Sequence, residues 1–468
     1  MSFEKRTALR FIVPGAVLAH CTVRRAAREA WSTQVPRCHE RDGELPCISC
    51  VCWGEVIAVK ACNTTMWWPV AVETAALALA LGPFIRHRME MSRWASEPLN
   101  PVHHEPPADL ALTVLLPVWN EASVIERKLT NLAEQQVRLN LHLIDSASTD
   151  GTVARAQAWL VQHPNAFDEV TVDVMPRRLG KSAAVVRALE DLADNEPGLV
   201  CMTDADAMLA PGTLLRLMTW FNDPMVGAVG AVPDRSHARQ EERQHRDAWE
   251  AMRLAESAVD STPFLEGSCM MWRSSTLLPN DLVTYANADD AQIATAIRCK
   301  GWRSIADAGA TFTDVAPLSA EGQRRQKVRR GQGLQRLLMR RRREAGHSKQ
   351  GVFGRIVRRQ HHFHIVAPLL LTVASVAAAV RWGLILAFGW PEASTTAAQL
   401  HLAATGMEAI TLLAWFGAKQ GRSWGPLTLL GQWLISMTWL MRSLVLLARG
   451  RSLHVWEQHR DERMLNQE

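Results

Sequence analysis

The chain has 468 residues, of which 48% are hydrophobic and 21% are charged, and its formal net charge is +5. Such a hydrophobic share exceeds what one core usually needs, which argues against a single soluble domain and predicts membrane spans beside a folded domain. The positive charge is concentrated between residues 324 and 343. This basic run adjoins apolar segments and contains no aromatic residue, so nucleic-acid binding is disfavoured.

The first 65 residues are Cys-rich and stay unassigned. They hold six of the nine cysteines, including Cys47 and Cys50, with Cys38 upstream. A zinc site would need another spaced pair of ligands, which this segment does not provide, so a poorly structured N-terminus is favoured. The apolar run over 11–19 is only weakly similar to a signal peptide, because a proline interrupts it and no convincing cleavage site follows.

Residues 66–86 predict one transmembrane helix, since about 20 apolar residues cross a hydrocarbon core of roughly 30 Å. Glu73 is the one costly residue in this segment. Arg86, Arg88 and Arg93 follow directly, and cytoplasmic loops carry an excess of basic residues. The chain after this helix is therefore expected in the cytoplasm.

Residues 108–320 change to short β-rich runs that alternate with helical periodicity. This alternation predicts an α/β domain around a mostly parallel sheet, in which ligands bind beyond the carboxyl ends of the strands. The expected strands are Leu112–Val118, Leu141–Ile144, Val170–Val174, Leu199–Thr203 and Val226–Val232, and the clearest helices are Ser123–Gln135 and Lys181–Leu192.

The chain becomes apolar again over 363–450. One apolar segment could be a buried core helix, but three in succession after a soluble domain favour membrane spans. They are expected near 363–388, 397–418 and 424–447, after a basic juxtamembrane segment (321–362) and before a polar tail (451–468). The sequence thus predicts an integral protein of the plasma (inner) membrane with a cytoplasmic α/β domain.

Two carboxylates two residues apart, Asp204 and Asp206, end a hydrophobic run. Inside a strand they would point to opposite faces, but at its end, where the chain turns toward Pro211, both can converge on one ligand. Paired carboxylates suit Mg²⁺ or Mn²⁺, which completes its coordination with water and phosphate oxygens. A solvated acidic turn is the alternative for such a pair taken alone.

Three further segments, 115–121, 143–152 and 178–181, follow predicted strands where a nucleotide pocket would form. Together with the segment that ends in Asp206, they resemble in order and spacing the successive signatures of family 2 glycosyltransferases, over roughly residues 112–335. The resemblance implies a GT-A type nucleotide-diphospho-sugar transferase domain with a helical transmembrane bundle. It also implies a UDP-sugar donor, Mg²⁺ or Mn²⁺, and an inverting reaction.

The resemblance also implies roles for individual residues. Those that it places along the nucleotide cleft are Pro117, Asn120 and Glu121, and Asp145 would contact the base. Asp204 would approach the ribose or diphosphate and help to hold the metal, and Asp206 would bind the metal. The second segment departs from the usual Asp-Asp-Gly-Ser form, because Ser146 and Ala147 follow Asp145.

Gly180 and Lys181 open a predicted helix, whose backbone N–H groups and lysine cation could bind a diphosphate. The segment lacks the full Gly-x-x-x-x-Gly-Lys-Ser/Thr pattern, so a P-loop kinase or ATPase is disfavoured. A plain helix N-terminus is the alternative.

Gly267 and Ser268 resemble the family's acceptor-site segment, with a tight turn beside a strand as the alternative. Asp289 and Asp290 open the next predicted helix and match the family's acidic pair. The match implies that Asp290 accepts the proton of the acceptor hydroxyl, which requires hydrogen-bond reach. In the purely structural alternative, Asp289 is the N-cap and Asp290 interacts with the helix dipole.

Arg329 and Arg330 belong to a segment that resembles the Gln-x-x-Arg-Trp segment of processive polysaccharide synthases, although no tryptophan is present. Their fork-shaped guanidinium groups could clamp a diphosphate. A basic helix attracted to anionic lipid headgroups is the alternative, and it is preferred for Arg336 and for residues 340–343.

The expected function is metal-dependent transfer of a hexosyl or N-acetylhexosaminyl group to a growing polysaccharide, as in the similar cellulose, hyaluronan and poly-N-acetylglucosamine synthases. The missing tryptophan and only three C-terminal spans keep a single transfer to a membrane lipid as an alternative. A non-catalytic nucleotide-sugar-binding membrane protein is the third, which the retained Asp204, Asp206 and Asp290 disfavour.

Overall fold

The computed structural model describes residues 48–94, 99–103, 105–192, 198–234, 240–314, 320–390, 396–422 and 424–453. The zinc interpretation of Cys38 and Cys47, the signal-like run over 11–19 and the last part of the polar tail lie outside these ranges. The chain divides into two units at residue 61, and the second unit, 62–468, carries everything discussed below.

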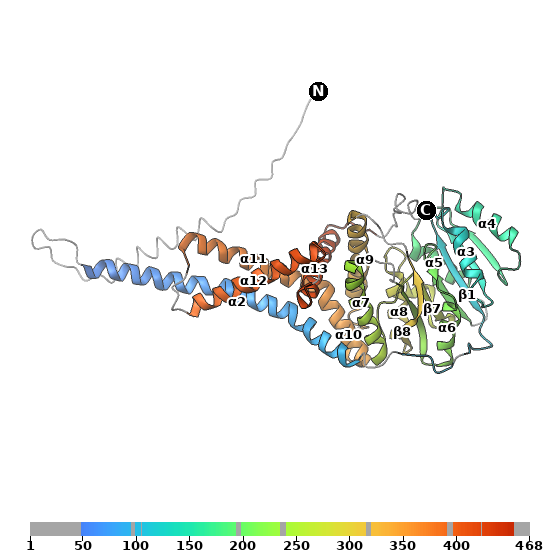
Figure 1. Cartoon of the computed structure of the whole chain (residues 1–468), viewed down its shortest axis with the longest axis horizontal. Helices are drawn as coiled ribbons and strands as arrows, with labels where there is room; N and C mark the ends of the chain where they lie inside the picture. The colour runs from blue at the N-terminus through green and yellow to red at the C-terminus, as the bar shows by residue number, and fades with distance from the viewer. Residues whose placement is uncertain are drawn as a thin grey trace, which may run out of the picture. The chain divides into compact units, whose positions relative to one another are not determined.

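The described chain alternates strands with helices and then continues as long helices (Figure 1). The strands are β1 (Leu112–Val118), β2 (Asn140–Asp145), β3 (Val170–Val174), β4 (Leu199–Thr203), β5 (Met208–Leu209), β6 (Val226–Pro233), β7 (Cys269–Arg273) and β8 (Arg303–Thr313). The α-helices are α2 (Ile48–Trp94), α3 (Ile125–Ala133), α4 (Thr152–Gln162), α5 (Lys181–Asp191), α6 (Thr213–Thr219), α7 (Gln240–Val259), α8 (Asp289–Cys299), α9 (Ala320–Arg341), α10 (Gly351–His361), α11 (Ala367–Phe388), α12 (Thr396–Lys419) and α13 (Pro426–Ala448). Short helical turns are η1 (Trp220–Asn222), η2 (Ser274–Thr276), η3 (Pro279–Asp281), η4 (Ser348–Gln350) and the π-helical η5 (His362–Val366).

The strands form one eight-stranded sheet in the order β3-β2-β1-β4-β7-β6-β8-β5. The expected parallel arrangement holds from β3 to β4, where β1 pairs in parallel with both β2 and β4. It fails at β7, which runs antiparallel to β4 and β6, and at β5, which runs antiparallel to β8. Apolar runs reveal a strand but not its direction, because direction depends on pairing between distant segments.

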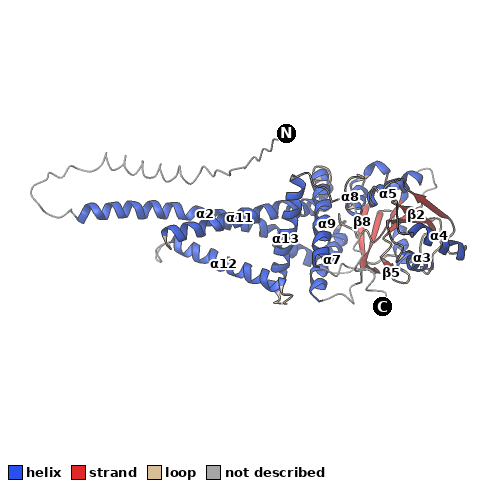
Figure 2. Ribbon diagram, turned by 90° about the horizontal axis from the view of Figure 1, so that it is seen from above, coloured by secondary structure: helices blue, strands red, loops and turns tan. Residues whose placement is uncertain are grey.

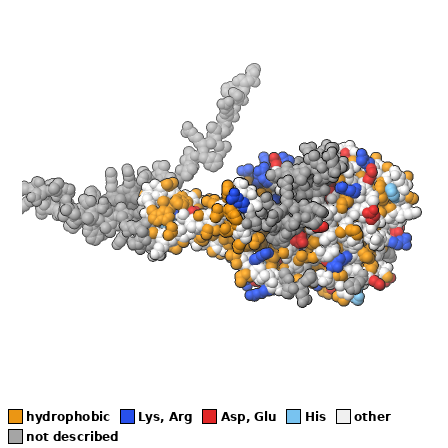
Figure 3. All heavy atoms as spheres, viewed as in Figure 1, with side chains coloured by type: hydrophobic (Ala, Val, Ile, Leu, Met, Phe, Trp, Pro, Cys, Tyr) orange, Lys and Arg blue, Asp and Glu red, His pale blue; other side chains and the backbone are white. Residues whose placement is uncertain are grey.

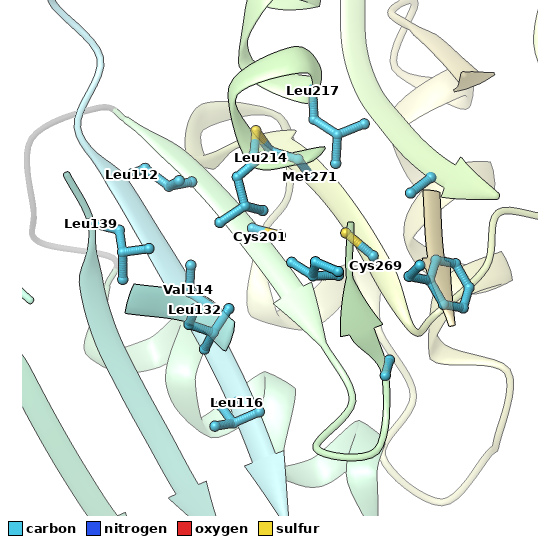
Figure 4. Packing of buried hydrophobic residues seen from close by; sticks show 14 of the residues in the cluster. Leu112, Val114, Leu116, Leu132, Leu139, Cys201, Leu214, Leu217, Cys269 and Met271 are labelled. Carbon is cyan, nitrogen blue, oxygen red and sulfur yellow. The ribbon is translucent and has the colours of Figure 1, made fainter. Parts of the chain in front are cut away.

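The core occupies both faces of the sheet, because successive side chains of a strand point to opposite sides. Val114 and Leu116 of β1 pack in one cluster with Leu132 of α3 (Figure 4). Leu115, the residue between them, packs in the other cluster with Ala184 of α5. Fully burying a side chain such as leucine contributes about 1.5–3 kcal/mol, so the two layers stabilise the strand ends that carry the site.

In the described part of the chain, four helical segments are long and apolar enough to cross a membrane: Trp67–Trp94, Ser348–Phe388, Thr396–Lys419 and Pro426–Ala448. They match the expected number of spans, although the first and second extend further into polar sequence than expected. Apolar side chains cover much of the visible surface of these helices (Figure 3). This is the surface expected of helices that contact lipid.

Charged side chains inside the helical bundle pair with one another. Arg381 of α11 is fully buried and its Nε donates to Glu73 Oε2 of α2 at 2.9 Å. Its Nη2 lies 2.6 Å from Glu408 Oε2 of α12. Charges at membrane depth are costly unless they are paired inside the bundle. Glu73 and Arg381, which interrupt the apolar pattern of two helices, therefore compensate each other's charge.

Helix α9 connects the sheet domain with the apolar helices, which lie beyond it in Figure 2. The amide of Gln335 is fully buried, and its Nε2 donates to the carbonyls of His364 and Leu440 at 2.8 and 2.9 Å. The hydroxyl of Ser443, in α13, donates to Gln335 Oε1 at 2.7 Å. These three hydrogen bonds fix the position of α9 against η5 and α13, because breaking any of them would leave a buried polar group unsatisfied.

Candidate active site

A cavity of about 250 Å³ opens at the carboxyl end of β4. Seven elements or the loops beside them contribute to its wall: the end of β4, the segment before β7, the starts of α5 and α8, and residues of α7, of α9 and of the loop after β8. The charged residues that line it are Lys181, Asp204, Asp206, Arg253, Glu266, Asp289, Asp290, Asp314, Arg329 and Arg330, together with Gly267 and Ser268. The cavity thus holds carboxylates and cations side by side.

Lys181 is the first residue of α5 and lies at the centre of this charge cluster. Its Nζ donates to Asp204 Oδ1 at 2.6 Å and to the carbonyl of Gly267 at 3.0 Å. The same Nζ lies 3.5 Å from Asp289 Oδ2. Burial by itself would lower the pKa of Lys181, but Asp204 and Asp289 raise it above its ordinary value. Lys181 therefore stays charged and links the ends of two distant segments.

Asp204 is also held from the β7 side. The hydroxyl of Ser268 donates to Asp204 Oδ2 at 3.2 Å, and the hydroxyl of Thr203 donates to the carbonyl of Ser268 at 2.8 Å. This contact exists because β7 pairs antiparallel with β4, which places Cys269 opposite Thr203. The segment predicted to meet the acceptor thus lies against the segment predicted to bind the metal.

Asp289 and Asp290 occupy the first turn of α8. The N-cap is Ala288, in the left-handed region at φ 65°, and it makes no side-chain capping bond. The interpretation of Asp289 as the N-cap is therefore wrong: its carboxylate turns toward Lys181. Burial, followed by the adjacent Asp289, raises the pKa of Asp290 to about 7. A carboxyl group with that pKa can exchange a proton near neutral pH.

Gly267 provides the close approach between the acceptor segment and this acidic pair. A Cβ atom at this position would lie 3.3 Å from Asp290 Cβ and 3.3 Å from Lys181 Nζ. Any larger residue would have to displace one of the two charged side chains. The absence of a side chain here keeps Lys181 and Asp290 within one small space.

Arg329 and Arg330 reach the cavity from α9. The side-chain amide of Asn287, just before α8, donates to the carbonyl of Arg329 and so ties the two helices together. Burial by itself would lower the pKa of Arg330, but the facing carboxylates, led by Glu266 and Asp314, raise it above its ordinary value. Both arginines line the same cavity as the acidic pair.

The remaining predicted residues lie at the carboxyl ends of β1 and β2 or in the loop after β1. Pro117 lines a small hollow that it shares with Lys181. Asn120 bonds the second loop, with its backbone N–H donating to Ser148 Oγ at 2.8 Å. Asp145 is buried, and its Oδ2 accepts the backbone N–H of Ser148 at 2.9 Å.

Glu121 is fully buried beside these residues, and its backbone N–H donates to Thr152 Oγ1 at 2.7 Å. Asn120, Glu121 and Asp145 are not among the residues that line the described cavity. The bonds that the structure gives them hold the β1 and β2 loops together.

Lys128 is a residue of this region that sequence analysis missed. It is fully buried in α3, and its Nζ donates to Thr203 Oγ1 at 2.8 Å and to the carbonyl of Ala207. Burial lowers the pKa of Lys128 to about 8. The sequence does contain a signal for this residue. Lys128 comes three residues after the buried Ile125, which puts a lysine on the apolar face of the helix.

Two further contacts had no signal in the sequence. The Arg178 guanidinium lies over the ring of Trp119, 3.3 Å from its centroid, and both residues line the small hollow beside Lys181. Arg253 of α7 pairs with Glu266 at 2.7 Å on the cavity wall. The first pair joins segments far apart in the sequence and the second joins α7 to the segment before β7, so only the folded chain reveals them.

The carboxylates at the end of β4 fit a hard divalent cation. Asp204 and Asp206 both line the cavity and supply oxygen donors, and Mg²⁺ is commonly held by one or two carboxylates with water and phosphate completing its shell. Elsewhere in the described chain, His142, Asp173 and Asp191 bring metal-ligand atoms within 4.8 Å of one another. There Arg187 pairs with Asp173 at 3.1 Å, and the three residues lie outside the cavity that Asp204 and Asp206 line.

Comparisons with known proteins concern the sheet domain and its fold. Residues 113–277 match the family model Glycosyl transferase family 2. An N-acetylglucosaminyltransferase of Rhizobium leguminosarum bv. viciae is 26% identical over 180 residues, which are 36% of this chain and only 40% of that relative's length.

A solved mannosyltransferase from Pyrobaculum calidifontis, in complex with GDP-Man and Mn²⁺, is 28% identical, with a TM-score of 0.63 over 81% of this chain and 98% of that one. The expected GT-A fold is thereby confirmed. Residues 113–277 therefore match the glycosyl transferase family 2 model and lie in a domain of GT-A type, which is joined to four long apolar helices in the described part of the chain.

Proposed function

We propose that the chain transfers a sugar from a nucleotide-sugar donor to an acceptor hydroxyl with inversion. The observation that carries this proposal is the meeting, in one cavity, of the Asp204 and Asp206 carboxylates, the acidic pair at the start of α8 and the cation of Lys181. Transfer needs positive charge for a leaving diphosphate and a base for the incoming hydroxyl, and this cavity has both.

The residues divide this work between them. A bound Mg²⁺ or Mn²⁺, held by Asp206 with Asp204, would neutralise charge on the leaving nucleoside diphosphate. Lys181 and Arg330 would bind diphosphate oxygens, a task that suits arginine's fork of donors. Asp290, with its pKa near 7, would accept the proton of the acceptor hydroxyl.

We place the transferase domain, 108–320, on the cytoplasmic side of the plasma (inner) membrane. The support is the basic sequence that follows the first apolar helix, with Arg86, Arg88 and Arg93. In this layout the membrane spans are 66–86 and three within 363–450, and 321–362 is a basic segment next to the membrane. Membrane lipid is then a direct neighbour of the protein.

For the donor we propose a nucleotide-activated hexose or N-acetylhexosamine. The two relatives suggest different donor sugars, since one is named as an N-acetylglucosaminyltransferase and the other was solved with GDP-Man. Full-length protein in membranes should be given UDP-N-acetylglucosamine, UDP-glucose or GDP-mannose with Mn²⁺, and release of nucleoside diphosphate measured. Release from none of them would favour the non-catalytic alternative.

For the acceptor, a growing polysaccharide is the first candidate and a membrane lipid the second. The lipid candidate is favoured by a mostly apolar cavity of about 880 Å³ between α2, α11, α12 and α13, with Leu371 and Leu434 in its wall. A cavity of this kind suits an apolar chain better than a hydrated sugar polymer. Product size from membranes given the donor separates the two, because a lipid acceptor gives short organic-soluble products.

A further inference from the structure

A separate cavity of about 490 Å³ lies where α10 leads into α11. Its wall carries three arginines and two histidines, and no carboxylate contributes to it. These residues are Arg342, Arg343, Arg358, His361 and His362. A volume of this size is typical of a small-molecule site, and the charged side chains among its lining residues are basic.

The wall is built by a turn that packs against a helix. Arg342 and Arg343 lie in the turn after α9, and Arg358 lies in α10. The Arg358 guanidinium donates to the carbonyl of Gly346 in the same turn. A Cβ atom at Gly346 would lie 3.4 Å from Arg358 Cγ, so the turn and the helix are in close contact. This contact places three arginines from two segments in the wall of one cavity.

The acidic residues nearby are paired with other arginines. Glu344 pairs with Arg341 at 3.0 Å, and Glu90 pairs with Arg359 at 2.6 Å. Among the residues that the structure describes, no carboxylate forms an ion pair with Arg342, Arg343 or Arg358. Their charge is therefore uncompensated within the described chain, which favours an anionic ligand.

The cavity lies at the level where apolar helices begin. His362 Nε2 is 3.4 Å from the carbonyl of Ala80 in α2, and α11 starts five residues later at Ala367. Val357 and Val366 add apolar surface to the lining. A ligand with a phosphate next to an apolar part would satisfy both kinds of surface.

We propose that this cavity is a specific binding site for a phosphate group, presented at the membrane surface by an anionic lipid headgroup or supplied as a soluble phosphate ester. Arginine matches phosphate oxygens with paired donors, which gives geometric specificity beyond simple attraction. The proposal differs from a diffuse attraction of the basic segment to lipid, which would depend only on total charge.

The test uses the purified full-length chain in detergent, titrated with phosphatidylglycerol or phosphatidylcholine and followed by native mass spectrometry. We expect one phosphatidylglycerol per chain at low concentration, and at least tenfold weaker binding by R342Q/R343Q. The matched control is R88Q/R355Q, which removes the same charge from exposed arginines that do not line the cavity, and it should stay within twofold of wild type.

Equal weakening of the two double variants, or equal binding of phosphatidylcholine, would overturn the proposal in favour of diffuse attraction. The variant R342K/R343K controls for a folding defect in R342Q/R343Q. Because it keeps the positive charge, it should recover at least half of the affinity that R342Q/R343Q loses. Inorganic phosphate and glycerol 3-phosphate distinguish the sources: displacement of the lipid at millimolar concentration identifies a soluble ester as a ligand, and failure to displace it identifies the lipid. Binding of neither lipid nor soluble phosphate would refute the site.

Discussion

Lys181 Nζ lies 2.6 Å from Asp204 Oδ1, so the first residue of α5 holds the carboxylate that ends β4. The pair is mostly buried, with both side chains about one-fifth exposed or less. A diphosphate entering the cavity would meet this ammonium group and compete with Asp204 for it. Under the proposed function, Lys181 would exchange a protein carboxylate for a donor phosphate.

Lys181→Met should raise the donor KM by about 10- to 100-fold, because a hydrogen bond to a charged group contributes about 1.5–3 kcal/mol. The measurement is initial rate against donor concentration. Arg187→Met removes an exposed cation from the same helix, outside the cavity, and should leave KM within twofold of wild type. Equal effects of the two substitutions would show that Lys181 has no special relation to the donor.

Asp206→Asn should abolish metal-dependent turnover while expression and membrane insertion stay intact, because an amide oxygen is a poorer ligand for Mg²⁺ or Mn²⁺ than a carboxylate. Removing metal from the wild type with EDTA should have the same effect, and adding Mn²⁺ should restore activity to the wild type alone. Asp168→Asn, at an exposed ion pair with Arg138, is the matched control. Wild-type turnover in Asp206→Asn would show that Asp206 does not bind a metal that the reaction needs.

Asp290→Asn should lower kcat by about 10²- to 10⁴-fold with donor binding retained, since general-base catalysis is typically worth that much. Asp289→Asn should be milder. Near-wild-type turnover of folded Asp290→Asn would mean that this residue only interacts with the helix dipole, worth about 0.3–1 kcal/mol of stability. A severe loss of kcat confined to Asp289→Asn would identify Asp289 as the base.

The rate should depend on pH through Asp290, whose pKa is raised to about 7 by burial and by Asp289. The base works only when deprotonated, so kcat should be level above pH 7 and fall about tenfold per pH unit well below it. The profile of log kcat against pH between 5.5 and 8.5 tests this. The residual activity of Asp290→Asn should lack the acidic limb, and a flat wild-type profile would contradict the assignment.

Membrane orientation is testable with tags near residues 101 and 345. Both should be cytoplasmic, because basic residues follow the first apolar helix and precede the next one. Protease or maleimide access in sealed cells and in inverted vesicles measures this directly. Access to either tag from outside the cell would require a different topology.

Local pattern alone predicted much of the fold. The ends of β1, β3 and β4 agree with the sequence prediction. Their apolar runs are bounded by turn residues, and strand periodicity depends only on residues that are adjacent in the sequence. Asp204 and Asp206 were identifiable for the same reason, since they come directly after such a run. The resemblance to a known family then suggested which distant segments belong together.

Tertiary structure decided what lies beside those carboxylates. Ser268 is 64 residues from Asp204 and Lys181 is 23 residues from it, and the reversed direction of β7 is what brings Ser268 to the site. The Arg381 and Glu73 pair spans 308 residues and turns two apparent interruptions of apolar helices into one buried contact.

The sequence by itself therefore indicated five of the eight strands, the apolar helices and the acidic motifs, because each depends on residues that are neighbours along the chain, whereas β5, β7 and β8 were not predicted. Only the folded chain decided that Lys128 lies beneath the Asp204 segment and that the pKa of Asp290 is near 7. The physical reason is that burial and the charges of distant segments set both properties, and neither exists until the elements have packed.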